Sequence, residues 1–254
     1  MRKILSYLQI VYSIYAVLVL LLVILILFPF VLLTAVLPKK TRGNVIYRVT
    51  RFAIDIAMLS WGIYQRNIYE VPHNRKKAVI FVFNHISYLD ALTLLKAIRF
   101  QHMRGLGKAE IGDIPIAGFI YRSAVIMVKR TDAEDRARSI ADLKEALTNN
   151  ISIALAPEGT FNTTNKPLIS FFDGAFKIAI QTQTAIKPLL FLDTYDRYSY
   201  KGAFTLTPGK SRVVYLEEIP VEGYTIEDLP LLKQKVYDAM EKGLIKYKAS
   251  WIKD

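Results

Sequence analysis

Phe83-Asn84-His85-Ile86-Ser87-Tyr88-Leu89-Asp90 is the stretch from which the fold of this chain can be worked outward. It closes an apolar run over residues 78–83, which predicts a buried strand. Leucines at helical spacing follow from Leu92, so a helix is expected to begin directly after the stretch. His85 therefore lies where the strand ends, and Asp90 lies in or near the first helical turn.

This placement allows His85 and Asp90 to face each other. Residues five apart on one continuous helix lie well off a common face. Across a strand-loop-helix junction, however, Asp90 can hydrogen-bond one imidazole nitrogen and leave the other free to accept a proton from a hydroxyl nucleophile. A histidine near an aspartate is more often a structural pair than a catalytic one. Here Asn84 and Ser87 add further polar groups beside the pair.

A second polar loop supports a functional interpretation. Pro157-Glu158-Gly159-Thr160 follows the apolar run 151–156, which also predicts a buried strand. Polar loops that leave buried strands are typical of the active-site edge of an α/β sheet.

Four ordered blocks of the chain resemble the glycerolipid acyltransferase family, whose best-known members are the lysophosphatidic acid acyltransferases. The blocks are the Asn-His-x-x-x-x-Asp motif (Asn84, His85 and Asp90), the apolar strand 124–130 ending in Arg130, Pro157-Glu158-Gly159-Thr160, and the apolar strand 186–190 containing Pro188. Lys108-Ala109-Glu110, Pro115 and Gly118 resemble the segment between the first two blocks. The resemblance covers roughly residues 68–220.

The resemblance implies acyl transfer from a thioester to the sn-2 hydroxyl of 1-acylglycerol-3-phosphate, which makes phosphatidic acid for phospholipid biosynthesis. In it His85 is the general base and Asp90 orients it, while the nucleophile is the acceptor's own hydroxyl. No cofactor is implied beyond the co-substrate, which is acyl-CoA or acyl carrier protein. The residues expected to bind substrate are Asn84, Ser87, Lys108, Arg130, Glu158, Gly159 and Thr160.

The chain departs from the family pattern at three positions. Ala124 and Lys129 replace the usual glycine and acidic residue of the second block, and Phe161 replaces an arginine that the family uses on the acceptor phosphate. The last change leaves the acceptor open: another lysophospholipid or a lyso-aminolipid is an alternative. A catalytically idle, membrane-tethered binding module is a third hypothesis, against which the intact His85 and Asp90 argue.

The amino-terminal region predicts a membrane anchor. Apolar residues make up 52% of the 254-residue chain, and no charged residue occurs between Ile4 and Pro38. As a helix, residues 10–37 would be about 42 Å long against about 30 Å of hydrocarbon, so they can span with tilt or break at Pro29 into a shallow hairpin. A secretory signal peptide fits poorly, because its apolar core would be shorter.

Basic residues follow the predicted anchor. They favour a location of the rest of the chain at the cytoplasmic face of the cell membrane. Between residues 43 and 64, apolar side chains recur at helical spacing, which suits either an anionic membrane surface or packing on the enzyme domain. They are Val45, Val49, Phe52, Ile56, Leu59 and Ile63. The net charge of +12 suits membrane lipid or an anionic substrate, and no nucleic-acid motif is present. The chain has no cysteine and three histidines, so no metal site is expected.

Alternating apolar runs and helical patterns predict an α/β fold with a mixed, largely parallel sheet flanked by helices. Strands are expected at 78–83, 102–106, 124–129, 151–156, 186–192, 203–207 and 212–217. Helices are expected at 89–99, 132–148, 173–182 and 226–246. Residues 1–66 are assigned to the anchor and amphipathic helix and 67–254 to the catalytic domain, with Lys129 and Lys187 expected to be solvated.

Overall fold

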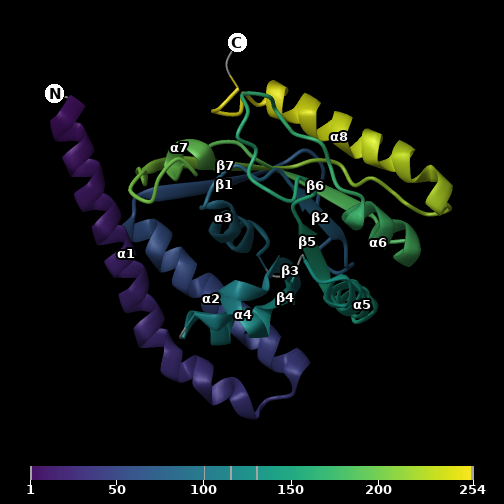
Figure 1. The fold of residues 1–254 in the computed structure, drawn as a ribbon, viewed down its shortest axis with the longest axis horizontal. Coiled ribbons are helices and arrows are strands. Elements are labelled where there is room, and N and C mark those ends of the chain that lie inside the picture. The colour runs from purple at the N-terminus through teal and green to yellow at the C-terminus, as the bar shows by residue number, and fades with distance from the viewer. Residues whose placement is uncertain (1, 100, 115, 130, 253–254) are drawn as a thin grey trace.

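The computed structural model describes residues 2–99, 101–114, 116–129 and 131–252. In this part of the chain seven strands form one sheet, in the order β1-β7-β6-β2-β5-β3-β4 (Figure 1). The strands are β1 (Ile63–Tyr69), β2 (Ile80–Phe83), β3 (Met103–Lys108), β4 (Val125–Val128), β5 (Ser152–Leu155), β6 (Ile186–Phe191) and β7 (Gly209–Tyr215). Neighbouring strands are parallel except β6 and β7. The expected mixed, largely parallel sheet is therefore confirmed.

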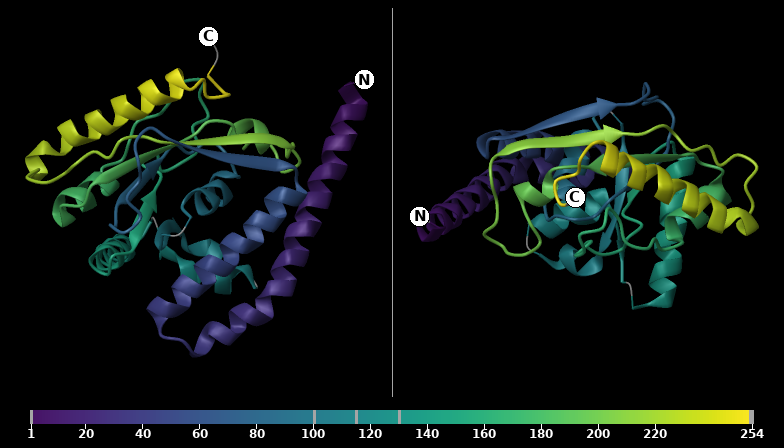
Figure 2. Two further views of the ribbon diagram at one scale, coloured as in Figure 1. Left: turned by 180° about the vertical axis from the view of Figure 1, so that it is seen from behind. Right: turned by 90° about the horizontal axis from the view of Figure 1, so that it is seen from above.

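Helices cover both faces of the sheet (Figures 1 and 2). They are α1 (Arg2–Leu33), α2 (Lys39–Ser60), α3 (Asp90–Ala97), α4 (Ala117–Ala124), α5 (Ala133–Thr148), α6 (Gly174–Thr182), α7 (Thr194–Arg197) and α8 (Leu229–Lys246), with short 3-10 turns η1 (Thr34–Val36), η2 (Ala109–Asp113) and η3 (Ile226–Asp228). Phe81 of β2 packs toward α2 and α3, whereas Ile80 and Val82 pack toward α5, α6 and α8. Alternate side chains of a strand point to opposite faces, so a strand buried on both faces is continuously apolar.

The strand expected at 203–207 is wrong. Those residues form an irregular loop, in which the Thr205 hydroxyl donates to the carbonyls of Ser199 and Gly202. Such local bonds compete with strand pairing, and Pro208 follows before β7 begins at Gly209. Leu206 is buried against the helices of the anchor, which accounts for its apolar character.

The edge strand β1 is absent from the sequence-based expectation. Its middle is polar, and its first residue, Ile63, continues the preceding helical pattern. Two of the polar side chains form hydrogen bonds with α3: Gln65 donates to the carbonyl of Thr93, and Asn67 donates to that of Ala97. The expected domain boundary between residues 66 and 67 falls inside β1, because the first strand of the sheet already begins at Ile63.

The anchor forms a helical hairpin. Helix α1 continues through Pro29, and the chain turns at Leu37 and Pro38, so that α2 returns alongside α1 (Figure 1). Trp61, just after α2, donates its indole N–H to the carbonyl of Ala16 at 3.1 Å, and the Tyr12 hydroxyl donates to the carbonyl of Trp61. These bonds tie the amino-terminal half of α1 to the start of the sheet.

Helix α2 uses two apolar faces. One face packs on the catalytic domain and on α1, through Ile46, Tyr47, Ile54, Ala57 and Met58. The sequence-defined stripe is a different face, and its members Phe52, Ile56 and Leu59 are exposed. The structure is thus compatible with both interpretations of this segment, packing on the domain and contact with a membrane surface. The helix packs on the domain with one face and presents apolar side chains outward on the other.

Lys187 is buried, and the expectation that it is solvated is wrong. It lies in the central strand β6, and its ammonium is 3.9 Å from the carboxylate of Glu218. Burial lowers the pKa of Lys187, with Glu218 opposing that shift. Hydrophobic periodicity carries no signal for such a buried charge, because its partner is 31 positions away in the chain.

The contact between α2 and the segment β3–α4 yields a test of the fold. A Cβ at Gly43 would lie 2.6 Å from the Arg104 guanidinium and 2.7 Å from the carbonyl oxygen of Ser123. Gly43→Ala should therefore lower stability by about 1–3 kcal/mol, although alanine favours a helix interior by about 1 kcal/mol. Thermal unfolding in detergent measures this. Gly174→Ala, where no atom lies within 4 Å, is the control, and equal unfolding temperatures for both variants would contradict the prediction.

Candidate active site

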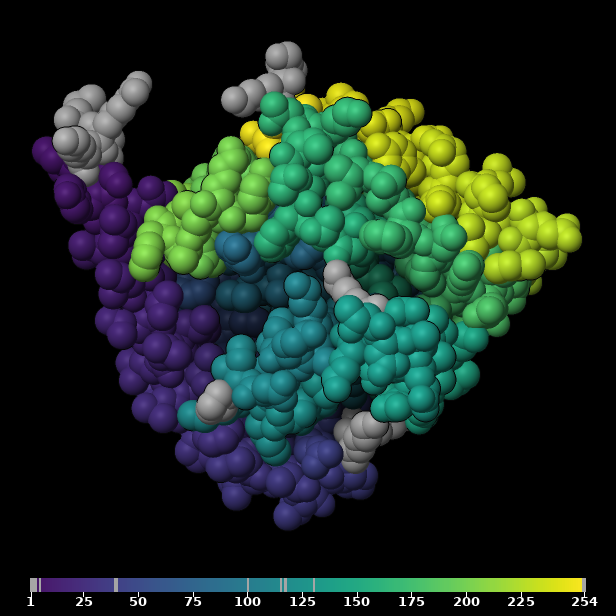
Figure 3. All heavy atoms as spheres, viewed as in Figure 1, coloured from purple at the N-terminus to yellow at the C-terminus, as the bar shows by residue number. Residues whose placement is uncertain are grey.

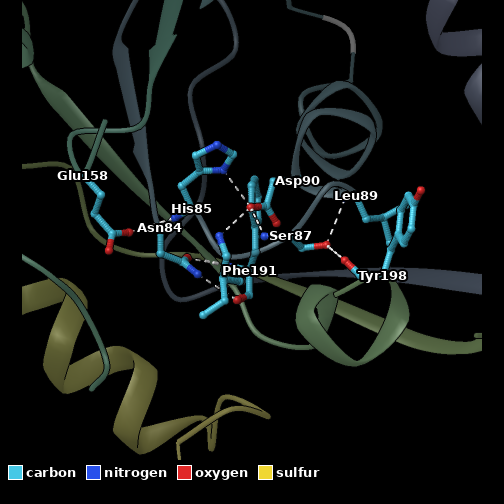
Figure 4. Close-up of polar contacts among 9 residues, drawn as sticks. Asn84, His85, Ser87, Leu89, Asp90, Glu158, Phe191 and Tyr198 are labelled. Carbon is cyan, nitrogen blue, oxygen red and sulfur yellow. Dashed lines mark hydrogen bonds and ion pairs between the residues drawn. The ribbon is translucent and has the colours of Figure 1, made fainter. Parts of the chain in front are cut away.

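Three loops meet where β2, β5 and β6 end, at one edge of the sheet (Figure 4). His85 follows β2, Asp90 opens α3, and Glu158 follows β5. Figure 3 shows a hollow on this face of the molecule, bordered by α1 and by the loop before β7, with the blue of the chain around β2 and α3 at its floor. Parallel neighbours thus bring together His85 and Glu158, which are 73 residues apart in the chain.

His85 and Asp90 form the expected pair. The His85 Nδ1 lies 2.9 Å from Asp90 Oδ2, and the same oxygen accepts the backbone N–H groups of Ile86 and Ser87 at 2.7 and 2.8 Å. A carboxylate only accepts hydrogen bonds, so the neutral imidazole carries its proton on Nδ1. The other nitrogen, Nε2, points away from Asp90 (Figure 4). Because the His85 side chain is 30% exposed, an outside hydroxyl can reach that nitrogen.

Glu158 is buried and holds the backbone of His85. Its Oε1 accepts the His85 N–H at 2.8 Å, and its Oε2 accepts the N–H of Ile169 at 3.1 Å. Burial raises the pKa of Glu158 from 4.5 to about 7, while the two backbone donors act in the opposite direction. Both oxygens are therefore engaged within the protein, and this geometry favours a positioning role over direct contact with the acceptor.

The two residues after Glu158 differ in setting. Gly159 has a φ of +66°, and a Cβ there would lie 2.8 Å from the ring of Phe172. Glycine is required on both counts. Thr160 is exposed at the outer side of the loop, where its hydroxyl remains accessible to a substrate.

Asn84 and Ser87 have structural partners. The Asn84 amide donates to the carbonyl of Phe191 at 3.1 Å and accepts the N–H of Phe191 at 2.8 Å, which extends the pairing of β2 with β6. The Ser87 hydroxyl donates to the carbonyl of Tyr198 at 2.6 Å and accepts the N–H of Leu89. Both side chains are buried. Their polar groups shape the loop, and the geometry favours this role over the substrate contact expected of them.

The expected anion-binding residues lie farther along the sheet edge. Lys108 is the last residue of β3 and is exposed. Arg130 lies outside the described residues. Since β3 and β4 run parallel to β2, the ends of these strands face the same side as His85. In the ranges 2–99, 101–114, 116–129 and 131–252, no group of three or more His, Asp or Glu side chains is arranged to hold a metal ion.

Two residues next to the second loop also contact His85. The Asn162 N–H donates to the His85 carbonyl at 2.7 Å, and the Phe161 ring lies 4.4 Å from the imidazole, measured between centroids. Sequence reasoning noted Phe161 only as a departure from a family pattern and did not consider Asn162. Their adjacency to the Pro157–Thr160 block was the available signal.

The family model for "Acyltransferase" matches residues 62–192, half of the chain, and this segment includes His85, Asp90 and Glu158. The chain belongs to the acyltransferase family. Human 1-acyl-sn-glycerol-3-phosphate acyltransferase beta is 31% identical over 163 residues, which are 63% of this chain and 58% of that protein. The chain thus matches less than two thirds of that relative. The 1-acyl-sn-glycerol-3-phosphate acyltransferase of Helicobacter pylori is 26% identical over 172 residues, covering 67% of this chain and 70% of that protein.

The fold has a solved counterpart. The crystal structure of the 1-acyl-sn-glycerophosphate (LPA) acyltransferase from Thermotoga maritima superposes with a TM-score of 0.74. It covers 98% of this chain and 100% of the other, at 22% identity. Since the superposition takes in nearly the whole chain, the architecture extends beyond the segment that the family model matches.

The raised pKa of Glu158 predicts a pH-dependent stability. Between about pH 4.5 and 7 the native state holds a proton that the unfolded state has released. The contribution of Glu158 to stability therefore falls as pH rises through this window, by up to about 3 kcal/mol, and is constant above it. Glu158→Gln removes this titration. Urea unfolding in detergent from pH 4.5 to 8 should show a steeper fall for the wild type than for the variant, and parallel curves would contradict the assignment.

Proposed function

We propose that this chain is a membrane-associated 1-acylglycerol-3-phosphate O-acyltransferase that makes phosphatidic acid. The observation that carries the proposal is the His85 imidazole, held at Nδ1 by buried Asp90 with Nε2 directed outward. The family membership and the names of the relatives support the acceptor class.

The chemistry follows from the free nitrogen. The acceptor hydroxyl gives its proton to His85 Nε2 as its oxygen bonds to the thioester carbonyl carbon, and the carbon–sulfur bond then breaks. The imidazolium returns the proton to the departing thiolate. Asp90 stabilises the imidazolium through Nδ1. Ser87 is no candidate for an acyl-enzyme, because its hydroxyl is buried and bonded to Tyr198.

The acyl donor is proposed to be a thioester of coenzyme A or of acyl carrier protein. Both are anionic, and a chain with a net charge of +12 attracts either through its long-range field. The general-base chemistry at His85 is the same for both donors, because both present the same thioester to the acceptor.

The acceptor phosphate requires cationic partners. Arg130 and Lys108 are proposed for this role, Arg130 by its place in the second block and Lys108 by its exposure at the end of β3. Phe161 adds no charge beside His85. A lysophospholipid with a zwitterionic head group is therefore the second candidate acceptor, because it needs less positive charge in the pocket than a phosphate monoester does.

The membrane contact is proposed to be the hairpin of α1 and α2, lying in the cytoplasmic leaflet. Residues Ser6–Val36 are long and apolar enough to cross a bilayer. However, Asp55 of α2 is ion-paired with Lys96 and Arg99 of the catalytic domain, at 2.9 Å each. A helix bound in this way stays with the domain, and a charge at the bilayer centre would cost about 2.5–3.5 kcal/mol. A re-entrant anchor with both ends cytoplasmic fits these contacts better than a span.

An acceptor panel tests the proposed activity. Purified protein is incubated with acyl-CoA or acyl carrier protein and with 1-acylglycerol-3-phosphate, lysophosphatidylcholine or a lyso-aminolipid, and the products are identified by mass spectrometry. Phosphatidic acid should be the main product, and His85→Ala should reduce its formation about a hundredfold or more. Asp90→Asn should also be severe. A His85→Ala variant that keeps more than about a tenth of wild-type turnover would exclude the general base.

The proposed leaflet placement predicts lipid contact for the outer face of α2. The chain has no cysteine, so Leu59→Cys can be labelled alone with an environment-sensitive fluorophore. In anionic vesicles its emission should shift to the blue, and a lipid-borne quencher should reduce it. Leu231→Cys on α8 is the control, because the two leucines are 65% and 61% exposed. Equal quenching at both positions, or none at Leu59→Cys, would contradict the placement.

A further inference from the structure

The loop after β5 forms hydrogen bonds with both backbone groups of His85, the N–H and the carbonyl. The His85 N–H donates to Glu158 Oε1 at 2.8 Å, and the His85 carbonyl accepts the N–H of Asn162 at 2.7 Å. Phe161 lies between Glu158 and Asn162 in the sequence. The two hydrogen bonds to the His85 backbone therefore bring the Phe161 side chain to the imidazole.

Among the residues that the structure describes, the imidazole has one side-chain hydrogen bond, from Nδ1 to Asp90. That bond sets the general orientation of the ring, but a hydrogen bond tolerates misalignment and the χ2 torsion of histidine has a broad energy well. The ring can therefore still swing through a limited range about its Cβ–Cγ bond. The Phe161 ring lies 4.4 Å from the imidazole centroid with the planes 52° apart, which is contact distance for a ring pair. It thus blocks the swing on one side, while Phe83 meets the imidazole edge-on at 6.4 Å.

Phe161 is itself held by two other loops. Tyr88, from the loop between β2 and α3, meets its ring at 5.1 Å and 90°. Tyr200, from the loop before β7, stacks on it at 6.0 Å and 22°. Tyr88 in turn contacts Tyr198 at 5.3 Å. A side chain that contacts rings from two other loops has few alternative rotamers, so it can hold the orientation of its neighbour.

We propose that Phe161 is a positioning residue, which fixes the plane of the His85 imidazole so that Nε2 faces the acceptor hydroxyl. The proposal rests on the general-base role of His85 proposed above. It assigns a function to the position where related sequences often carry arginine: here a neutral ring orients the base rather than binding a phosphate. Proton transfer and nucleophilic attack depend steeply on alignment, and small displacements cost up to about a hundredfold in rate.

The kinetic test compares ring-retaining and ring-removing variants. Phe161→Leu keeps apolar volume but loses the ring, and it should lower kcat about tenfold while the acceptor KM changes less than about twofold. Phe161→Tyr should retain at least about half of wild-type kcat, because the ring contact survives. Phe204→Leu, at a phenylalanine that is half-exposed on the loop before β7, is the matched control and should leave kcat unchanged.

A double variant separates positioning from substrate binding. If Phe161 acts through His85, Phe161→Leu should cause no further loss in the His85→Ala background, measured on the residual product. The same loss in both backgrounds, a change confined to the acceptor KM, or full activity of Phe161→Leu would overturn the proposal.

A readout without turnover keeps this proposal separate from the proposed function. With ¹³C-labelled histidine, the chain gives three imidazole signals, and His85→Ala identifies that of His85. Loss of the neighbouring ring in Phe161→Leu should shift the His85 signal and leave those of His73 and His102 in place. An unmoved His85 signal would refute the contact. If the signal moves but His85→Ala is fully active, the general base is wrong, and with it the positioning role.

Discussion

The buried carboxylate of Asp90 is the constraint on which the site depends. A charge removed from water has to be compensated by donors within the protein. One oxygen of Asp90 meets this need with three donors, two from the backbone of the loop and one from His85. These bonds close the loop between β2 and α3 into a single conformation. The base is therefore oriented by the same interactions that allow the carboxylate to be buried.

The neighbouring loop also contains a buried carboxylate. Glu158 accepts two backbone donors, and burial raises its pKa to about 7. Asp90 has a third donor, the imidazole, which becomes cationic in the proposed reaction. The two carboxylates thus serve different purposes: Asp90 responds to the charge of His85, whereas Glu158 fixes the main chain on which His85 is carried.

Local pattern in the sequence was sufficient for the central strands and for the pairing of His85 with Asp90, because both depend on residues within one short stretch. It failed where partners are distant. The side chains Gln65 and Asn67 of the polar strand β1 bond carbonyls of α3, and Lys187 is buried beside Glu218. The motif residue Asn84 looks functional in sequence, yet both ends of its amide complete the sheet. Only the folded chain distinguishes a residue that contacts substrate from one that holds the loop.

The anchor and the site share one rigid frame, which can be followed through specific contacts. Trp61 bonds the backbone of α1 and immediately precedes β1. The β1 side chains of Gln65 and Asn67 bond two carbonyls of α3, the helix whose first residue is Asp90. From α1 to the carboxylate that orients His85, each step is a direct hydrogen bond or a covalent link through one secondary-structure element. In the proposed leaflet placement, this frame sets the height of His85 above the bilayer. An acceptor that keeps its acyl chain in the membrane would then bring its hydroxyl to a base held at a fixed depth.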